Sequence, residues 1–279
     1  MTSLEKSAKK DTVSMIITIL LYGVGAASVP YVWLSNLFGG LKEVEWFVAF
    51  LAKTACAILP VYLIFQFGLS NMLKVNSKKL KATVFVLPAF LVMLNNFPFV
   101  PIMLGDMSIN ATFLQVITYS LFCLSIGILE ETVFRGCLLP LCMFKCSKSK
   151  KGLFWAVVQS SALFGAMHLF NLLAGFSPAV FLQVGYSFLI GLVCGFALIV
   201  SGNIYAPILL HAVFDFGGFL LGEGLATGVL WGLENIIWTA VSSVVLGVVL
   251  VVIFIKKDFS HLYREWNLNR VIEEKEDNK

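Results

Sequence analysis

The chain has 279 residues, of which 59% are hydrophobic and only 13% are charged, and its formal net charge is +4. Soluble domains are about 45–50% apolar and about 25% charged, so this composition argues against a soluble enzyme, a disordered chain and a coiled coil. We therefore predict an integral membrane protein in a lipid bilayer. Because the positive charges fall between apolar runs, we expect no nucleic-acid partner.

Eight apolar runs approach the length of about 20 residues that a transmembrane helix needs. The fourth has about 33 residues and would reach ~50 Å as a straight helix, so it must tilt, break or pass beyond a ~30 Å hydrocarbon layer. We predict an all-α, polytopic membrane protein with about eight transmembrane helices in a single domain, 1–279. The runs are 13–37, 46–69, 83–104, 112–144, 153–173, 179–200, 204–221 and 235–255.

The charges alternate between the two sides of this map. With the N-terminus inside, 17 of the 20 Lys and Arg residues fall on the cytoplasmic side, as the positive-inside rule expects. This predicts an N-in, C-in topology and a charged cytoplasmic tail, 256–279. The basic residues assigned to the cytoplasm include Lys6, Lys9, Lys10, Lys74, Lys78, Lys79, Lys81, Lys145, Lys148, Lys150 and Lys151.

Two local features interrupt the apolar runs. In the third run, Asn95 and Asn96 followed by Pro98 and Pro101 predict a broken helix rather than a site. In the second run, Lys53 lies close enough to an interface for its side chain to snorkel.

The remaining ionisable residues within the runs form a small set. Such groups are costly in a bilayer and are functional candidates by default. The set comprises Glu130, Glu131 and Arg135 in the fourth run, His168 in the fifth, and His211 and Asp215 in the seventh.

Their spacing suggests separate roles. Glu131 and Arg135 are four residues apart, so they share a helix face and can form an ion pair. Glu130 is rotated about 100° from Glu131 and can point into a cavity instead. His211 and Asp215 also share a face. We expect a tilted bundle to bring these groups together near the middle of the membrane.

These groups suit peptide hydrolysis. A buried glutamate can act as general base on water, while imidazoles and a polar group stabilise the oxyanion of an attacked amide. A divalent metal such as Zn²⁺ is the alternative, with His168, His211, Asp215 and Glu130 as candidate ligands. The residues do not separate the two mechanisms, and no cofactor is firmly implied.

Three short motifs carry a family resemblance. EETVFR at 130–135 resembles EExxxR, FGAMH at 164–168 resembles FxxxH, and HAVFD at 211–215 resembles HxxxN/D. These are the motifs, in order, of the CAAX protease and bacteriocin-processing family, also called CPBP or Abi. The family comprises intramembrane glutamic or metallo-endopeptidases and includes the Ras-converting prenyl-protein endopeptidases. The resemblance implies a catalytic core at about 112–221.

The resemblance also implies roles for individual residues. Glu130 matches the family's water-activating glutamate, assisted by His168, and Glu131 with Arg135 matches its supporting ion pair. His211 and the residue at 215 match the pair that holds the oxyanion. Position 215 is Asp where the prenyl-protease branch has Asn. An ionised Asp would repel an oxyanion, so the departure implies a protonated Asp, a role in orienting His211, or a bound metal.

The predicted function is an intramembrane endopeptidase that cuts a membrane-associated peptide or protein, such as a bacteriocin precursor. A non-catalytic immunity or peptide-binding protein and an ion-coupled transporter are the alternatives. The use of 17 Lys against 3 Arg favours a bacterial plasma membrane. We expect access from the cytoplasmic side or from the bilayer, through a groove between the fourth, fifth and seventh runs.

Overall fold

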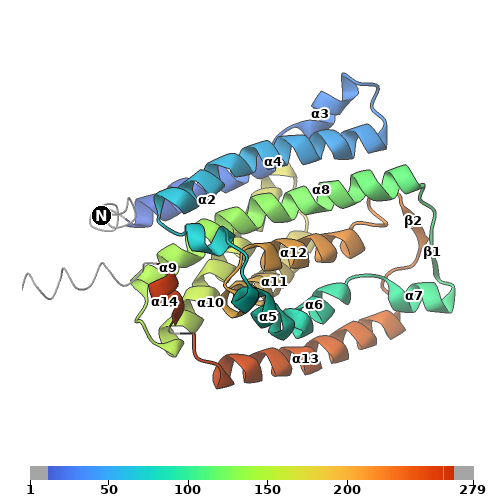
Figure 1. Ribbon diagram of the computed structural model, residues 1–279. Helices are drawn as coiled ribbons and strands as arrows, with labels where there is room; N and C mark the ends of the chain where they lie inside the picture. The colour runs from blue at the N-terminus through green and yellow to red at the C-terminus, as the bar shows by residue number, and fades with distance from the viewer. Residues whose placement is uncertain (1–11, 260, 267–279) are drawn as a thin grey trace, which may run out of the picture.

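The computed structural model describes residues 12–259 and 261–266 and consists mostly of helices (Figure 1). The predictions for Lys6, Lys9, Lys10 and most of the tail lie outside this part of the chain. The helices are α2 (Thr12–Ala27), α3 (Tyr31–Asn36), α4 (Lys42–Gln66), α5 (Ser77–Thr83), α6 (Leu87–Leu94), α7 (Phe99–Leu104), α8 (Phe113–Glu131), α9 (Leu139–Lys145), α10 (Lys150–Met167), α11 (Ala179–Ser201), α12 (Tyr205–Gly218), α13 (Leu233–Lys256) and α14 (His261–Glu265).

Short elements connect these helices. Three are 3₁₀-helices: η1 (Ser70–Leu73), η2 (Val84–Val86) and η4 (His168–Ala174). Strands β1 (Met107–Ile109) and β2 (Ala226–Gly228) pair antiparallel, with Met107 opposite Gly228. This two-stranded sheet lies at one end of the bundle. Helix α2 begins at the other end, where α14 also lies (Figure 1).

Within the described residues, six helical stretches are long and apolar enough to cross a membrane. Each lies on a predicted run. The other two predicted runs are helical but shorter. Residues 83–104 are divided among η2, α6 and α7, and the break between α6 and α7 falls at the predicted Asn and Pro residues. The run 204–221 becomes α12, of 14 residues. The count of eight and the N-in, C-in orientation therefore stay predictions.

The long fourth run is one continuous helical stretch that changes from α-helix to π-helix and back to α-helix. Helix α8 passes directly into a π-helix, η3 (Thr132–Leu138), and then into α9. A π-helix has wider turns than an α-helix and occurs mainly at functional sites. Pro140 follows closely and has no backbone N–H for the helical ladder, which favours a local departure from α geometry. The π-helix contains Arg135 and begins directly after Glu131.

Helix α8 forms the centre of the bundle. It packs against α4 on one side and α12 on another, and α10 packs against α11. Figure 1 shows α4 and α8 running side by side, with α13 along the opposite edge of the molecule. Tyr119 of α8 donates a hydrogen bond of 2.7 Å to the carbonyl of Phe216, and its ring packs against Trp46 of α4. These contacts tie α4, α8 and α12 together next to the predicted site.

Gly127 lets α8 approach α12 closely. A Cβ at this position would lie 2.7 Å from the carbonyl oxygen of Ile208, which is too short for any side chain. We therefore expect Gly127→Ala to push the helices apart and lower the free energy of unfolding by about 1–3 kcal/mol. Thermal unfolding in detergent measures this loss. Gly185→Ala in α11 is the matched control because its Cβ meets nothing within 4 Å, and equal stability of the two variants would contradict the prediction.

Lys53 is buried, with 7% of its surface exposed. Its ammonium donates a hydrogen bond of 3.1 Å to the carbonyl of Ala27, the last residue of α2. Carbonyl groups at a helix C-terminus lack intrahelical partners and attract cations. Lys53 therefore has a structural role in joining α4 to the end of α2.

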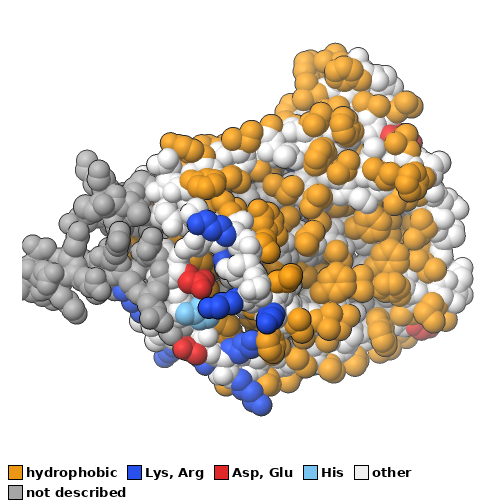
Figure 2. All heavy atoms as spheres, in the orientation of Figure 1, with side chains coloured by type: hydrophobic (Ala, Val, Ile, Leu, Met, Phe, Trp, Pro, Cys, Tyr) orange, Lys and Arg blue, Asp and Glu red, His pale blue; other side chains and the backbone are white. Residues whose placement is uncertain are grey.

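Many large hydrophobic side chains of the described residues are exposed. Figure 2 shows hydrophobic side chains covering the face in view, while Lys and Arg side chains gather toward the end that holds α9 and α14. An apolar belt with a basic end is the pattern that a bilayer requires.

Candidate active site

The centre of the predicted site is a buried network of three charged or polar side chains. Glu131 Oε1 accepts a hydrogen bond of 3.0 Å from Arg135 Nη1 and one of 2.7 Å from His211 Nδ1. The side chains of Glu131 and Arg135 are 0% and 1% exposed. The predicted ion pair is therefore present, and its carboxylate also reaches a residue 80 positions away on another helix.

The second ring nitrogen of His211 faces the two other predicted carboxylates. Because Nδ1 donates to Glu131, Nε2 is left to point toward Glu130 Oε2 at 3.7 Å and Asp215 Oδ2 at 3.6 Å. Both separations exceed a direct hydrogen bond and suit a bridging water or a substrate oxygen. Asp215 Oδ2 is buried and has no hydrogen-bond partner among the described residues. Glu130 and Asp215 thus both lie beside His211 Nε2.

His168 does not contact His211 directly, because the ring of Phe164 lies between them. Its Nδ1 donates a hydrogen bond of 3.0 Å to the carbonyl of Phe164, so Nε2 is the nitrogen that receives the Ser187 hydroxyl at 3.4 Å. The ring of Phe164 meets His168 and His211 edge-on, with ring centroids 5.3 and 5.7 Å apart. Phe164 therefore links the two histidines.

Phe164 also supports the ion pair. The guanidinium of Arg135 lies 4.7 Å from the centre of the Phe164 ring, within the range of a cation–π contact. Helix α11 covers the same guanidinium, because a Cβ at Gly191 would lie 3.1 Å from Arg135 Nη2. Arg135 is thus enclosed by α10 and α11 and cannot move away from Glu131 without repacking.

Among the described residues, one set of three has ligand atoms close enough together to hold a metal. Glu131, Cys194 and His211 have ligand atoms within 4.8 Å of one another, but Glu131 Oε1 and His211 Nδ1 already bond each other. Of the four predicted ligands, Glu130 and Asp215 lie 3.7 and 3.6 Å from His211 Nε2, but these three residues do not form a set whose ligand atoms all lie within 4.8 Å of one another among the described residues. His168 lies outside that group, since both of its ring nitrogens have protein partners.

Several supporting residues were missed by the sequence analysis. Ser187 contacts His168, and Tyr119 holds the backbone after Asp215. Asn96, interpreted only as part of a helix break, donates a hydrogen bond of 2.7 Å to the carbonyl of Phe214. Ser and Tyr are common in membrane helices and carry no signal by themselves, whereas an Asn in an apolar run is a polar group that needs a partner.

A large apolar cavity of the described residues lies away from the predicted entry groove. It is lined by residues of α6, α10, α11, α12 and α13, and by none of the six predicted site residues. A route between the fourth, fifth and seventh runs therefore stays a prediction.

Comparisons with known proteins support the motif assignment. The family model of type II CAAX prenyl endopeptidase Rce1-like matches residues 111–217, a segment that contains all three motifs and overlaps the expected core. Searches of curated proteins and of solved structures gave no match to the chain. Residues 111–217, which contain the predicted site, are therefore similar to the CAAX protease family.

Proposed function

We propose that this protein is an intramembrane endopeptidase that hydrolyses a peptide bond in a membrane-associated peptide or protein, using water activated by Glu130. The observation that carries the proposal is the position of the Glu130 and Asp215 carboxylates beside His211 Nε2, at 3.7 and 3.6 Å. These residues lie in a segment that matches the CAAX protease family. A bacterial plasma membrane and a bacteriocin precursor as substrate are part of the proposal.

The geometry supports a simple sequence of bond changes. A water between Glu130 and His211 loses a proton to Glu130 as its oxygen attacks the amide carbon. His211, protonated on both ring nitrogens and fixed through Nδ1 by Glu131, donates a hydrogen bond from Nε2 to the developing oxyanion. The C–N bond then breaks, and the proton held by Glu130 passes to the leaving amine. Assistance to Glu130 by His168 remains a prediction, because the contact between His168 and the site runs through Phe164.

A divalent metal would require the same side chains to move closer together. Glu130, His211 and Asp215 would then hold the ion, which would supply a Lewis acid and acidify a bound water. In that arrangement Glu131 would still orient His211 through Nδ1, as carboxylates often do for metal-bound histidines.

The test is cleavage of a fluorogenic peptide library by the full chain purified in detergent, with lipidated and plain peptides and with or without a chelator. Cleavage of membrane-associated peptides is the expected result, and its survival or loss in chelator distinguishes activated water from metal. Tight peptide binding without cleavage under either condition would overturn the proposal in favour of a binding or immunity protein.

Asp215 gives a sharper test of how the oxyanion is held. We expect Asp215→Asn to retain cleavage within about tenfold, because the amide is the same size and can donate a hydrogen bond to the oxyanion. Asp215→Leu should lower kcat by about 10²–10³-fold. Comparison of kcat for the two variants is the measurement. If Asn is as damaging as Leu, the negative charge itself is needed, as for orienting His211 or binding a metal.

A further inference from the structure

A cavity of about 970 Å³ lies between α13 and the body of the bundle. Its walls are almost wholly apolar and include Val92, Phe154, Val193, Phe196 and Leu250. Along α13 it extends from Thr239 to Ile255, which is ~24 Å of helix. The cavity is therefore long enough to run through most of a ~30 Å hydrocarbon layer.

Helix α13 packs chiefly on α6 and α7, so a space remains open between α13 and the other helices that line the cavity. Most of its side chains are exposed, and Gly247 opens its cavity face, since a Cβ there would meet nothing within 4 Å. The hydroxyl of Thr239 is buried on the same wall without a hydrogen-bond partner in the described residues. The inner wall includes Phe214, whose neighbour Asp215 belongs to the candidate active site. Because neighbouring residues of a helix are about 100° apart, the cavity and the site lie on adjacent faces of α12.

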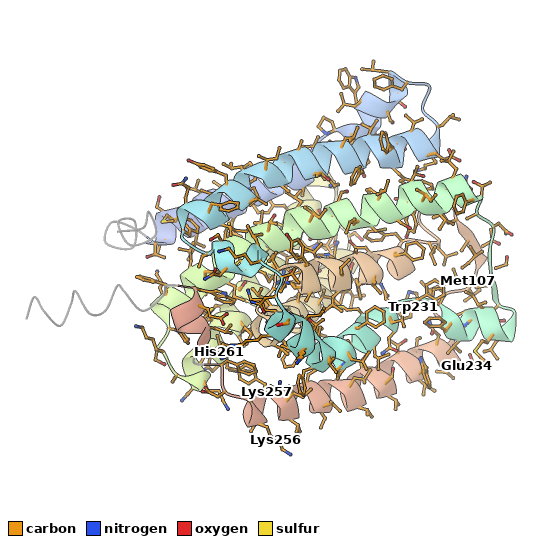
Figure 3. The ribbon with its side chains drawn as sticks, in the orientation of Figure 1. Met107, Trp231, Glu234, Lys256, Lys257 and His261 are labelled. Carbon is orange, nitrogen blue, oxygen red and sulfur yellow. The ribbon has the colours of Figure 1, made fainter. Side chains whose placement is uncertain are left out.

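One end of the cavity is basic. Lys150 and Lys151, at the start of α10, line that end, and Lys150 donates a hydrogen bond of 2.6 Å to the carbonyl of Ile255. Figure 3 shows Lys256 and Lys257 at the same end of α13, with Trp231 and Glu234 at the other end. Asp258 lies beside Lys150 and offsets part of the charge. An apolar space with an excess of lysines at one end is complementary to an anionic phospholipid, which has apolar chains and a negatively charged headgroup.

We propose that the cavity binds a diacyl phospholipid with a net negative headgroup. Its phosphate lies at Lys150 and Lys151, and its acyl chains extend along Phe154, Phe196 and Leu250 toward Gly247. The lipid fills the space that α13 leaves open and so holds α13 to the body of the bundle. This site does not depend on the proposed protease activity, because its residues are separate from Glu130, His211 and Asp215.

The test measures binding of phosphatidylglycerol and phosphatidylcholine to the delipidated full chain in neutral detergent by native mass spectrometry. We expect preferential retention of phosphatidylglycerol, and a loss of about thirtyfold in its affinity for the Lys150→Gln/Lys151→Gln variant. The control is Lys74→Gln/Lys78→Gln, which removes equal charge from residues that do not line the cavity. Equal retention of the two lipids, or equal losses in both double variants, would overturn the proposal.

A second variant tests the acyl-chain wall and does not alter charge. Gly247→Phe, at a position where a Cβ meets nothing within 4 Å, adds a ring to the cavity wall and should also reduce phosphatidylglycerol retention. Val248→Phe, at a 58%-exposed position on the same helix, should not. Glycerol 3-phosphate, which is a headgroup without chains, should fail to compete. Competition by glycerol 3-phosphate, or unchanged lipid binding by the Gly247→Phe variant, would show that the chains do not occupy this cavity. Unfolding temperatures close to wild type confirm that the variants are folded.

Discussion

Glu130→Gln is expected to reduce peptide cleavage by about 10²–10⁴-fold, the range that removal of a general base produces. The amide keeps the size of the side chain but cannot accept a proton from water. Glu130 is also partly exposed, unlike the buried Glu131, so the substitution leaves no unpaired charge in the core. The measurement is kcat on the best peptide substrate, together with thermal unfolding to show that stability is unchanged.

The matched control for Glu130 is Glu234→Gln. Glu234 is an exposed glutamate in the first turn of α13, at the end of that helix opposite Lys256 (Figure 3). Its substitution should leave kcat unchanged. Cleavage by the Glu130→Gln variant at the rate of wild type would rule out Glu130 as the base. If both Glu130→Gln and Glu234→Gln lose cleavage, the loss comes from removing a negative charge in general and not from a catalytic role of Glu130.

Arg135→Met is expected to cause the largest loss of stability, about 3–5 kcal/mol. The substitution leaves the Glu131 carboxylate charged, buried and short of one donor in a region from which water is excluded. It also removes the guanidinium that packs on Phe164. Thermal unfolding in detergent should show a decrease of roughly 10 °C.

The double variant Glu131→Gln/Arg135→Met separates charge from packing. Because it removes both charges of the pair, it should recover part of the stability lost in Arg135→Met, as expected when an unpaired buried charge is the main cost. It should not recover cleavage, because a neutral Gln orients His211 less strongly than the carboxylate does. A double variant less stable than Arg135→Met would show that the ion pair is not the dominant interaction.

Much of the fold and of the site could be predicted because the signals are local. The length of apolar runs determines where spans can lie, and all six candidate spans occur at predicted positions. The break in the third run was also predicted from a local signal, because the Pro residues in 95–101 lack the backbone N–H that a helix needs. The pairing of Glu131 with Arg135 follows from their spacing on one helix, and no other helix is needed to predict it.

The sequence by itself determined that this is a membrane protein and which few ionisable residues lie within its apolar runs, because composition and helical spacing are properties of consecutive residues. Only the tertiary structure decided that Glu131 holds His211 as well as Arg135, that Phe164 lies between His168 and His211, and that a cavity forms between α12 and α13. These features depend on how helices rotate and approach one another. That geometry is set by contacts such as Gly127 against Ile208, between residues far apart in the chain.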